Sequence, residues 1–463
     1  MPALATEALS RDAVDALPLA AWIERHARLS AAGLASGISA TGLVYQRSAF
    51  GQRIRPAKGS VLASPTTDPT DAGPDYFFHW LRDGAAVMDA ALALMKGPDA
   101  AAWIERFEDW VRFTLDLGRI SGRAFLSGGD FRRGALPGFA RYIRADDELA
   151  AIEGDRALDE ARYNADGSLD FVKWARPQHD GEALGALVAL RFWRRHRSTG
   201  DAARGALAEL IERGLGYAAA RAEAPCYDIW EEEIGDHYYT RLVQWTALEE
   251  GAAWIGDRGA AQGGKAERYR AAAARLARGL DGSWCDKRRI YRSRAEPTGA
   301  QNPKAFDTSV ILAVLHAGRE SGPHSVADPR VRSTLAQLED RFAADYALNR
   351  GHARPFAFGR YRGDRYFSGG AWYLASFAAA EFYYRLAAAS ASSADAEDFC
   401  ARGDAILAAV RGYVPASGEL SEQFDQTTGA QTSAKNLTWS YAAFITAWAA
   451  RNAAIRRAPA KPA

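Results

Sequence analysis

Residues 103–115 read WIERFEDWVRFTL, and this stretch indicates the fold class. Its apolar residues are Trp103, Ile104, Phe107, Trp110, Val111 and Leu115. They recur at the three- to four-residue spacing that places side chains on one face of an α-helix. Charged residues fill most of the intervening positions, so the stretch predicts an amphipathic helix with one buried face.

The same periodicity recurs along most of the chain. It covers residues 15–34, 82–96, 181–197, 205–221, 238–255, 266–280, 307–319, 331–347, 370–389, 397–411 and 436–454. Many of these segments have alanine-rich faces, which favour helices and allow them to approach closely. Strand signals are short and occur at Leu43–Tyr45, Ile54 and Val61–Leu62. About twelve helices predict an all-α toroid, in which inner helices are wrapped by outer ones.

We interpret the chain as one domain, 1–463, with a core at about 15–455, because no Pro-, Ser- or Gly-rich linker divides it. The segment 121–180 lacks a long helical pattern. Connections of that length inside a compact domain are usually functional, so we expect a structured loop region there.

The composition is that of a soluble globular protein with a large core: 48% of the 463 residues are hydrophobic and 25% are charged. A formal net charge of +1 argues against nucleic acid or a membrane as the main partner and fits a neutral ligand. Cys226, Cys285 and Cys400 are widely spaced, which predicts reduced thiols. The N-terminus lacks a signal-peptide pattern, so we expect a cytoplasmic location, with a secreted mature form whose signal was removed as the alternative. We expect a monomer.

Two acidic stretches lie far apart in the sequence: residues 227–233 read YDIWEEE and residues 420–425 read LSEQFD. Each sets carboxylates beside aromatic residues. Paired carboxyl groups in an aromatic cleft are typical of glycoside hydrolysis, in which one acid protonates the leaving oxygen and the other activates a water or attacks the sugar. For this chemistry the fold must bring the two stretches together.

Several further blocks combine aromatic, polar and charged residues. With the two acidic stretches they are, in sequence order, residues 61–65 (VLASP), 75–83 (DYFFHWLRD), 174–181 (WARPQHDG), 228–232 (DIWEE), 359–361 (GRY) with Asp364, Tyr366 and Trp372, 421–425 (SEQFD) and 437–441 (LTWSY). Through these blocks the chain resembles, from about residue 40 to 450, the inverting glucan 1,4-α-glucosidases, the glucoamylase family of glycoside hydrolases (family 15). The resemblance implies an (α/α)6 barrel, in agreement with the helix count. From the sequence we expect neither an appended starch-binding domain nor an N-terminal β-sandwich domain.

The resemblance implies that Glu231 is the general acid and Glu422 the general base. A donor at neutral pH needs a raised pKa, which burial beside Trp230 and the neighbouring Glu232 and Glu233 would produce. Glu231 is chosen among these three glutamates only by alignment on Trp230, and Glu233 departs from the apolar residue usual in the family. An inverting pair is expected about 6.5–9.5 Å apart.

Further residues are assigned by the resemblance. Substrate binding is implied for Tyr76, Trp80, Arg82, Asp83, Trp174, Arg176, Glu232, Arg360 and Trp372, and support of the base for Ser433 and Trp439. Arg82 and Asp83 could grip vicinal hydroxyls or form an internal ion pair. The tryptophans could be sugar-facing or belong to the core. His79, His179 and His237 show no metal-ligand spacing, so we predict no metal and no cofactor.

We therefore expect an exo-acting enzyme that releases β-D-glucose from the non-reducing ends of α-1,4-glucans or maltooligosaccharides. Two alternatives remain open. A relative of the same family could cleave α-1,6 bonds or trehalose, depending on subsite residues in loops such as 121–172. A non-catalytic sugar-binding regulatory protein is the other alternative, although such a binder has no need of both carboxylates.

Overall fold

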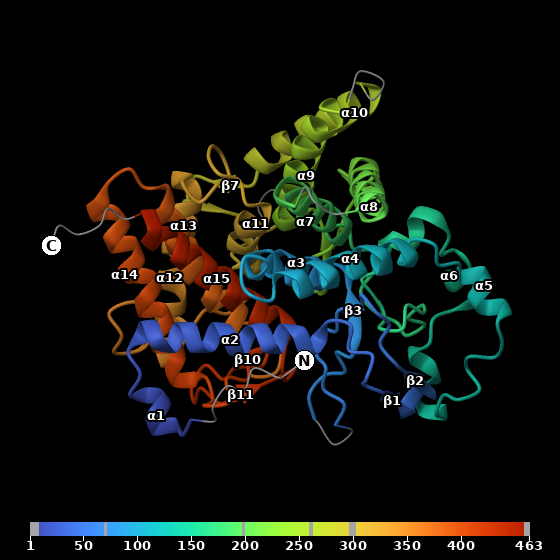
Figure 1. Ribbon diagram of the computed structural model, residues 1–463, viewed down its shortest axis with the longest axis horizontal. Helices are drawn as coiled ribbons and strands as arrows, with labels where there is room; N and C mark the ends of the chain where they lie inside the picture. Colours follow the sequence, from blue (N-terminus) through green and yellow to red (C-terminus); the bar gives the residue numbers. More distant parts are fainter. Residues whose placement is uncertain (1–8, 69–71, 197–199, 259–262, 296–301, 458–463) are drawn as a thin grey trace. The chain divides into compact units, whose positions relative to one another are not determined.

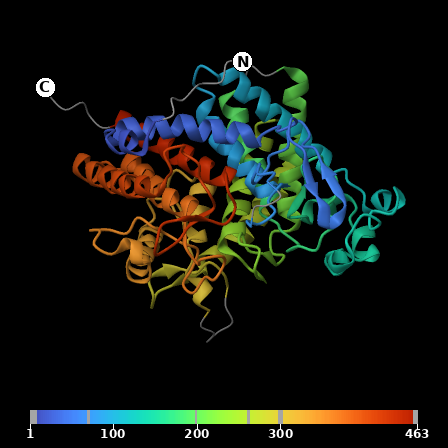
Figure 2. The same ribbon diagram turned by 90° about the horizontal axis from the view of Figure 1, so that it is seen from below.

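The computed structural model describes residues 9–68, 72–196, 200–258, 263–295 and 302–457 (Figures 1 and 2). The chain divides into two compact units: unit 1 comprises residues 1–35 and 281–463, and unit 2 comprises residues 36–280. A single catalytic domain stays a prediction, because this division does not show whether either unit folds alone.

Unit 2 is built from long helices of two kinds. They are α3 (Leu81–Leu94), α4 (Ala100–Leu117), α7 (Gly181–Arg195), α8 (Asp201–Ala220), α9 (Tyr238–Gly256) and α10 (Gly263–Asp281). Helices α3, α7 and α9 are buried along most of their length, whereas α4, α8 and α10 bury one face. Helix α7 packs against α3, α8 and α9. The amphipathic stretch that predicted a helix is α4, and its Trp103, Phe107 and Trp110 are buried.

Unit 1 repeats this division into buried and amphipathic helices. Its helices are α1 (Arg11–Asp15), α2 (Leu19–Gly37, which continues into residues 36–37), α11 (Ser309–Ala317), α12 (Pro329–Asp345), α13 (Tyr373–Ala389), α14 (Ser393–Val410) and α15 (Thr438–Arg457). Helix α13 is buried on all sides and packs against α11, α14 and α15. Gly403 of α14 makes one close approach possible, because a Cβ there would lie 2.6 Å from the ring of Tyr384.

Short antiparallel strands join the helices. In unit 2 they are β1 (Tyr45–Arg47) with β2 (Gln52–Ile54), β3 (Phe78–Trp80) with β4 (Arg162–Asn164), and β5 (Cys226–Tyr227) with β6 (Ile234–Gly235). In unit 1, β7 (Trp284–Cys285) pairs with β8 (Ile290–Tyr291), and β9 (Ala371–Trp372), β10 (Gln423–Phe424) and β11 (Gln431–Thr432) form a sheet with β10 in the middle. The predicted strands at Leu43–Tyr45 and Ile54 correspond to β1 and β2, and Val61 forms a single bridge with Ile38.

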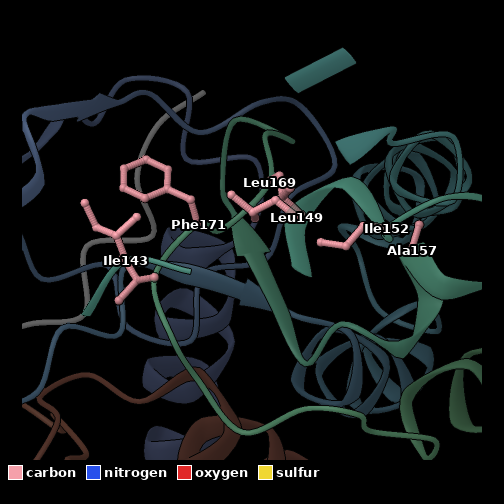
Figure 3. Packing of buried hydrophobic residues seen from close by; sticks show 7 residues of the cluster. Ile143, Leu149, Ile152, Ala157, Leu169 and Phe171 are labelled. Atoms are coloured by element: carbon pink, nitrogen blue, oxygen red, sulfur yellow. The ribbon is translucent and has the colours of Figure 1, made fainter. Parts of the chain in front are cut away.

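The segment 121–180 is structured, as predicted, by short elements around its own apolar cluster. It contains α5 (Gly122–Ser127), η2 (Pro137–Tyr142), α6 (Asp146–Ala150), η3 (Gly154–Asp159) and β4. The other 3-10 turns are η1 (Ser48–Phe50), η5 (Pro303–Ala305), η6 (Ala347–Asn349) and η7 (Arg411–Tyr413). Figure 3 shows the cluster, which consists of Ile143, Leu149, Ile152, Ala157, Leu169, Phe171 and Val172.

Of the helices within the described ranges, none combines the length and the low polarity that crossing a membrane requires.

Candidate active site

In unit 2, the strands β5 and β6 frame a tight loop that carries the acidic stretch. The Asp228 carboxylate organises this loop, because it accepts the backbone N–H groups of Trp230 at 2.7 Å, Glu232 at 3.2 Å and Glu233 at 3.0 Å. The N–H of Glu231 in turn donates to the carbonyl oxygen of Asp228 at 3.0 Å. Asp228 therefore holds the position of the predicted acid through the backbone on both sides of it.

Glu231 has a left-handed backbone conformation, with φ at +63°. A non-glycine residue in this region is uncommon and costs roughly 1–2 kcal/mol. Such strain is concentrated at functional sites, where the surrounding structure imposes it. Here the N–H groups of Trp230, Glu232 and Glu233, which donate to Asp228, hold the backbone on both sides of Glu231.

The Glu231 carboxylate accepts hydrogen bonds from donors on separate segments. Trp80 Nε1 at the end of β3 donates to Oε1 at 2.8 Å, and Arg82 Nη2 in the first turn of α3 donates to the same oxygen at 3.0 Å. Trp174, in the loop before α7, donates its indole N–H to Oε2. The side chain is largely buried. The structure thus fixes both oxygens of this carboxyl group in one orientation.

Arg82 connects Glu231 to the start of α7. Its Nη1 donates to Gln178 Oε1 at 3.0 Å and to Asp180 Oδ2 at 3.1 Å. Burial disfavours the charge of Arg82, but the nearby carboxylates of Asp180, Glu231 and Asp83 outweigh burial and raise its pKa. Arg82 is therefore a permanently charged anchor between the acid and α7. The internal ion pair considered from the sequence exists, and its closest carboxylate partners are Glu231 and Asp180, with Asp83 at 3.8 Å.

Asp83 lies one residue further along α3 and is almost completely buried. Burial raises the pKa of Asp83 to about 6, and the negative charges of Glu231 and Asp180 add to this effect while Arg82 opposes it. Asp83 is therefore ionised above about pH 6 and neutral below it. Only the ionised form is a pure acceptor for sugar hydroxyls.

This titration predicts a pH dependence of sugar binding. As the pH falls from 7 to 5, we expect KM for maltoheptaose to rise about tenfold, because Asp83 changes from mostly ionised to mostly protonated. KM is to be measured across this range for the wild type and for Asp83→Asn. The variant should bind weakly at every pH and show no inflection near pH 6. A wild-type KM that does not change between pH 7 and pH 5 would contradict sugar binding by Asp83.

Aromatic rings surround the Glu231 carboxylate in unit 2. Trp80 packs edge to face against Tyr76 at 5.3 Å and against Trp174 at 6.3 Å between ring centroids. Trp80 is buried, whereas Trp174 is 40% exposed. Trp80 thus belongs to the core and also donates to Glu231, whereas Trp174 is partly exposed beside it. The proposed contact of Tyr76 with the base stays a prediction.

Arg162 is a site residue that the sequence reasoning missed. Its guanidinium lies 3.6 Å from the ring centroid of Trp174 and 4.0 Å from that of Phe78, and its Nε donates to Asp170 at 2.9 Å. It reaches this position because Trp80 and Arg162 are partners in the β3–β4 pairing. A buried cation sandwiched between rings holds the Trp174 indole in place. No motif or spacing marks this residue in the sequence.

Arg176 is fully engaged within the protein. It forms ion pairs with Glu160 and, at 3.0 Å, with Asp170, and it donates to the carbonyl oxygen of Val172 at 3.2 Å. These contacts hold the loop that carries Trp174. A direct contact of Arg176 with sugar stays a prediction.

In unit 1, the predicted base Glu422 lies directly before β10. The Glu422 N–H donates to the carbonyl oxygen of Ala434 at 2.8 Å, and the Glu422 carbonyl oxygen accepts the N–H of Tyr373 at 3.3 Å. The Ser433 hydroxyl donates to Glu422 Oε2. Ser433 is left-handed, with φ at +66°, directly after β11. The predicted contact of Ser433 with Glu422 is thus present, whereas the role of Glu422 as the base stays a prediction.

The other unit 1 residues form an aromatic and cationic cluster. Arg360 makes a bidentate ion pair with Asp364 at 2.7 and 2.6 Å, and its guanidinium lies 5.1 Å from the ring centroid of Trp372. Trp439, at the start of α15, is buried with its ring 5.8 Å from that of His316. Trp372 belongs to β9, which pairs with the strand that follows Glu422. The separation of Glu231 and Glu422 stays a prediction, as do the sugar contacts of Glu232, Arg360 and Trp372.

The histidines of the motif blocks have structural contacts. His79 Nδ1 accepts the N–H of Val61 at 3.0 Å, and burial lowers its pKa to about 4, so the ring is neutral. His179 lies 3.5 Å from Asp159, and His237 bonds the carbonyl oxygen of Glu233 at 3.0 Å. Among the residues that the structure describes, no group of three or more His, Cys, Asp or Glu side chains is arranged to hold a metal ion. Cys226, Cys285 and Cys400 are free thiols.

Comparisons with known proteins identify related sequences. Residues 42–116 and 144–449 match the sequence model of the family described as Glycosyl hydrolases family 15. Glucoamylase-1 of Schizophyllum commune is 27% identical over 443 residues, which cover 86% of this chain and 70% of the relative.

Solved structures show the fold. The glucoamylase of Saccharomycopsis fibuligera superposes with a TM-score of 0.76 at 21% identity, covering 96% of this chain and 97% of that one. The glucoamylase of Hormoconis resinae also gives 0.76, at 23% identity, covering 96% of this chain and 77% of that one. The predicted all-α fold, an (α/α)6 barrel, is therefore confirmed.

Proposed function

Since the chain belongs to glycosyl hydrolases family 15, we propose that it is an exo-acting glucoamylase that releases β-D-glucose from the non-reducing ends of α-1,4-glucans and maltooligosaccharides with inversion. That it is a glycoside hydrolase follows from the family itself. The linkage, the stereochemistry and the roles of individual residues are the proposal. One observation carries it: the Glu231 carboxyl group is fixed by N–H donors of Trp80, Arg82 and Trp174.

In this proposal the sugar displaces the Trp174 N–H from Oε2 of Glu231, and this oxygen carries the proton while Oε1 still accepts from Trp80 and Arg82. Glu231 gives that proton to the glycosidic oxygen as the bond to the anomeric carbon breaks. A water attacks that carbon from the opposite face and gives its proton to Glu422. The new C–O bond therefore has the opposite configuration, and an α-linkage yields β-glucose. Exchange with solvent then returns a proton to Glu231 and removes one from Glu422.

The unit 2 geometry suggests where the sugar enters. Trp174 is the most exposed of the donors to Glu231. A glucose unit placed against its ring would exchange the indole N–H for the glycosidic oxygen as the partner of Glu231. Arg82 and Trp80 are buried, so they would keep the carboxyl group aimed during that exchange.

The stereochemistry tests the proposal directly. We expect β-glucose to appear first when maltoheptaose is hydrolysed, with α-glucose following only through mutarotation, because water attacks opposite the leaving group. Proton NMR of the anomeric signals in the first minutes measures this. Initial α-glucose would contradict inversion. Faster release from isomaltose or trehalose would instead assign the α-1,6 or trehalase specificity, and binding without turnover on any of these sugars would assign a non-catalytic sugar-binding role.

A further inference from the structure

Unit 2 carries a cluster of exposed apolar side chains outside the part of the chain that matches the family. Leu136, Phe139 and Tyr142, on or beside η2, are 51%, 39% and 42% exposed. They lie in the segment 117–143, between the two matched ranges 42–116 and 144–449. Exposed aromatic rings gathered on one short element are typical of a binding surface rather than of a packed core.

The exposed side chains on and beside η2 belong to a segment that contacts neighbouring parts of unit 2. Phe139 packs edge to face on Phe50 at 5.7 Å between ring centroids, and the N–H of Leu136 donates to the carbonyl oxygen of Ala49 at 3.0 Å. Phe50 in turn packs against the apolar cluster that includes Ile143 and Phe171 (Figure 3). Its members pack the neighbouring Phe50, Ile120, Phe125, Leu126, Phe131 and Ala135. Phe139 is therefore held by the half-buried Phe50, which itself packs on buried residues.

The surface continues into the residues that hold the acid. Ile143 forms an antiparallel bridge with Val172, and the N–H of Lys173 donates to the carbonyl oxygen of Tyr142 at 2.7 Å. The next residue is Trp174, whose indole donates to Glu231. Tyr142 is thus fixed to the chain immediately before the exposed tryptophan of the candidate active site.

The chemistry of the surface suits a carbohydrate. The rings of Phe139 and Tyr142 lie 6.1 Å apart with 49° between their planes, and both side chains are exposed. Arg141 lies 4.8 Å from the Tyr142 ring centroid and donates to its hydroxyl at 2.8 Å, and Lys173 donates to the Arg141 carbonyl oxygen at 2.9 Å. Apolar faces bordered by polar groups match the C–H faces and the hydroxyl rims of glucose units.

We propose that Phe139 and Tyr142 extend Trp174 into an aromatic platform that binds the glucose units of a long α-glucan on the leaving side of the cleaved bond. The inference rests on the proposed function, because a general acid lies on the side of the leaving oxygen, and Trp174 touches that acid. The platform selects for chain length. Maltose is too short to reach beyond Trp174, whereas maltoheptaose reaches Tyr142 and Phe139.

The test compares a short and a long substrate. In the double variant Phe139→Ser/Tyr142→Ser, we expect kcat/KM to fall about tenfold for maltoheptaose and to stay within about twofold of the wild type for maltose. Ile455→Ser, an equally exposed apolar residue at 48% on α15 of unit 1, is the matched control and should change neither value. Because all three side chains are exposed, the unfolding temperature should hardly change.

Two outcomes would overturn the platform. One is an unchanged ratio of maltoheptaose to maltose kcat/KM in the double variant. The other is a change of oligomeric state by sedimentation with maltoheptaose kinetics unaltered, which would make the patch an interface between copies of the chain. Calorimetric binding of maltoheptaose and maltose to Glu422→Gln, with and without the double substitution, measures sugar binding without hydrolysis. It therefore tests the platform separately from the proposed function. If the wild type hydrolyses neither sugar, the proposed function fails, while a selective loss of maltoheptaose binding still supports the platform.

Discussion

Glu231→Gln and Glu422→Gln are each expected to lower kcat for maltoheptaose by about 10²–10⁴-fold, the range that general acid–base catalysis contributes. Glutamine keeps the shape of the side chain but has no exchangeable acid proton and no negative charge, and its amide nitrogen cannot accept the Trp174 N–H. Glu231→Gln retains an acceptor for Trp80 and Arg82, so the loop should keep its structure. The rates are to be measured at saturating substrate, because the loss belongs to the chemical step.

A substrate with a good leaving group distinguishes the roles of the two carboxyl groups. α-Glucosyl fluoride needs little protonation to leave, so Glu231→Gln should recover most of its rate on this substrate, whereas Glu422→Gln should remain slow. Glu233→Gln is the matched control within the same loop and should change kcat by less than about tenfold. A comparable loss in Glu233→Gln with full activity in Glu231→Gln would move the acid to another glutamate.

Asp170→Ala is expected to produce the largest loss of stability, about 3–5 kcal/mol, because it leaves two buried cations without their shared partner. Asp170 accepts Arg162 Nε at 2.9 Å, Arg176 Nη2 at 3.0 Å and the N–H of Val172 at 2.9 Å. Burial alone would raise the pKa of Asp170, but the two arginines outweigh it and lower the pKa. Its contribution is therefore present at neutral pH and is lost as the pH falls below the ordinary aspartate value of 3.8.

Urea unfolding of the variant at pH 7 measures this loss. Asp116→Ala removes an exposed ion pair with Arg119 of 2.7 Å and should cost no more than about 1 kcal/mol. We also expect kcat to fall about tenfold in Asp170→Ala, because Arg162 and the Trp174 loop lose their anchor. Equal unfolding midpoints for the two variants would show that the buried charge cluster is not a stabilising element.

The helices were largely predictable, because each depends on a periodicity contained within its own residues. The pattern at 238–255 became α9 (Tyr238–Gly256), and that at 181–197 became α7 (Gly181–Arg195). Predicted ends differ by a few residues because caps depend on neighbours outside the pattern. The short elements α5 and η2 have no comparable signal. Phe125 of α5 packs on the cluster that includes Phe171, and Phe139 of η2 packs on Phe50, so both elements depend on residues distant in sequence.

The sequence by itself determined the family, the helical fold and the identity of the acidic and aromatic motifs, because these are carried by contiguous blocks of residues. Only the tertiary structure decided how Glu231 is held. Its donors Trp80, Arg82 and Trp174 come from three separate segments, and Arg162 reaches Trp174 only through the register of β3 with β4. Hydrogen bonds and cation–π contacts between distant segments leave no periodicity in the sequence, because their energy depends on distance and direction in space.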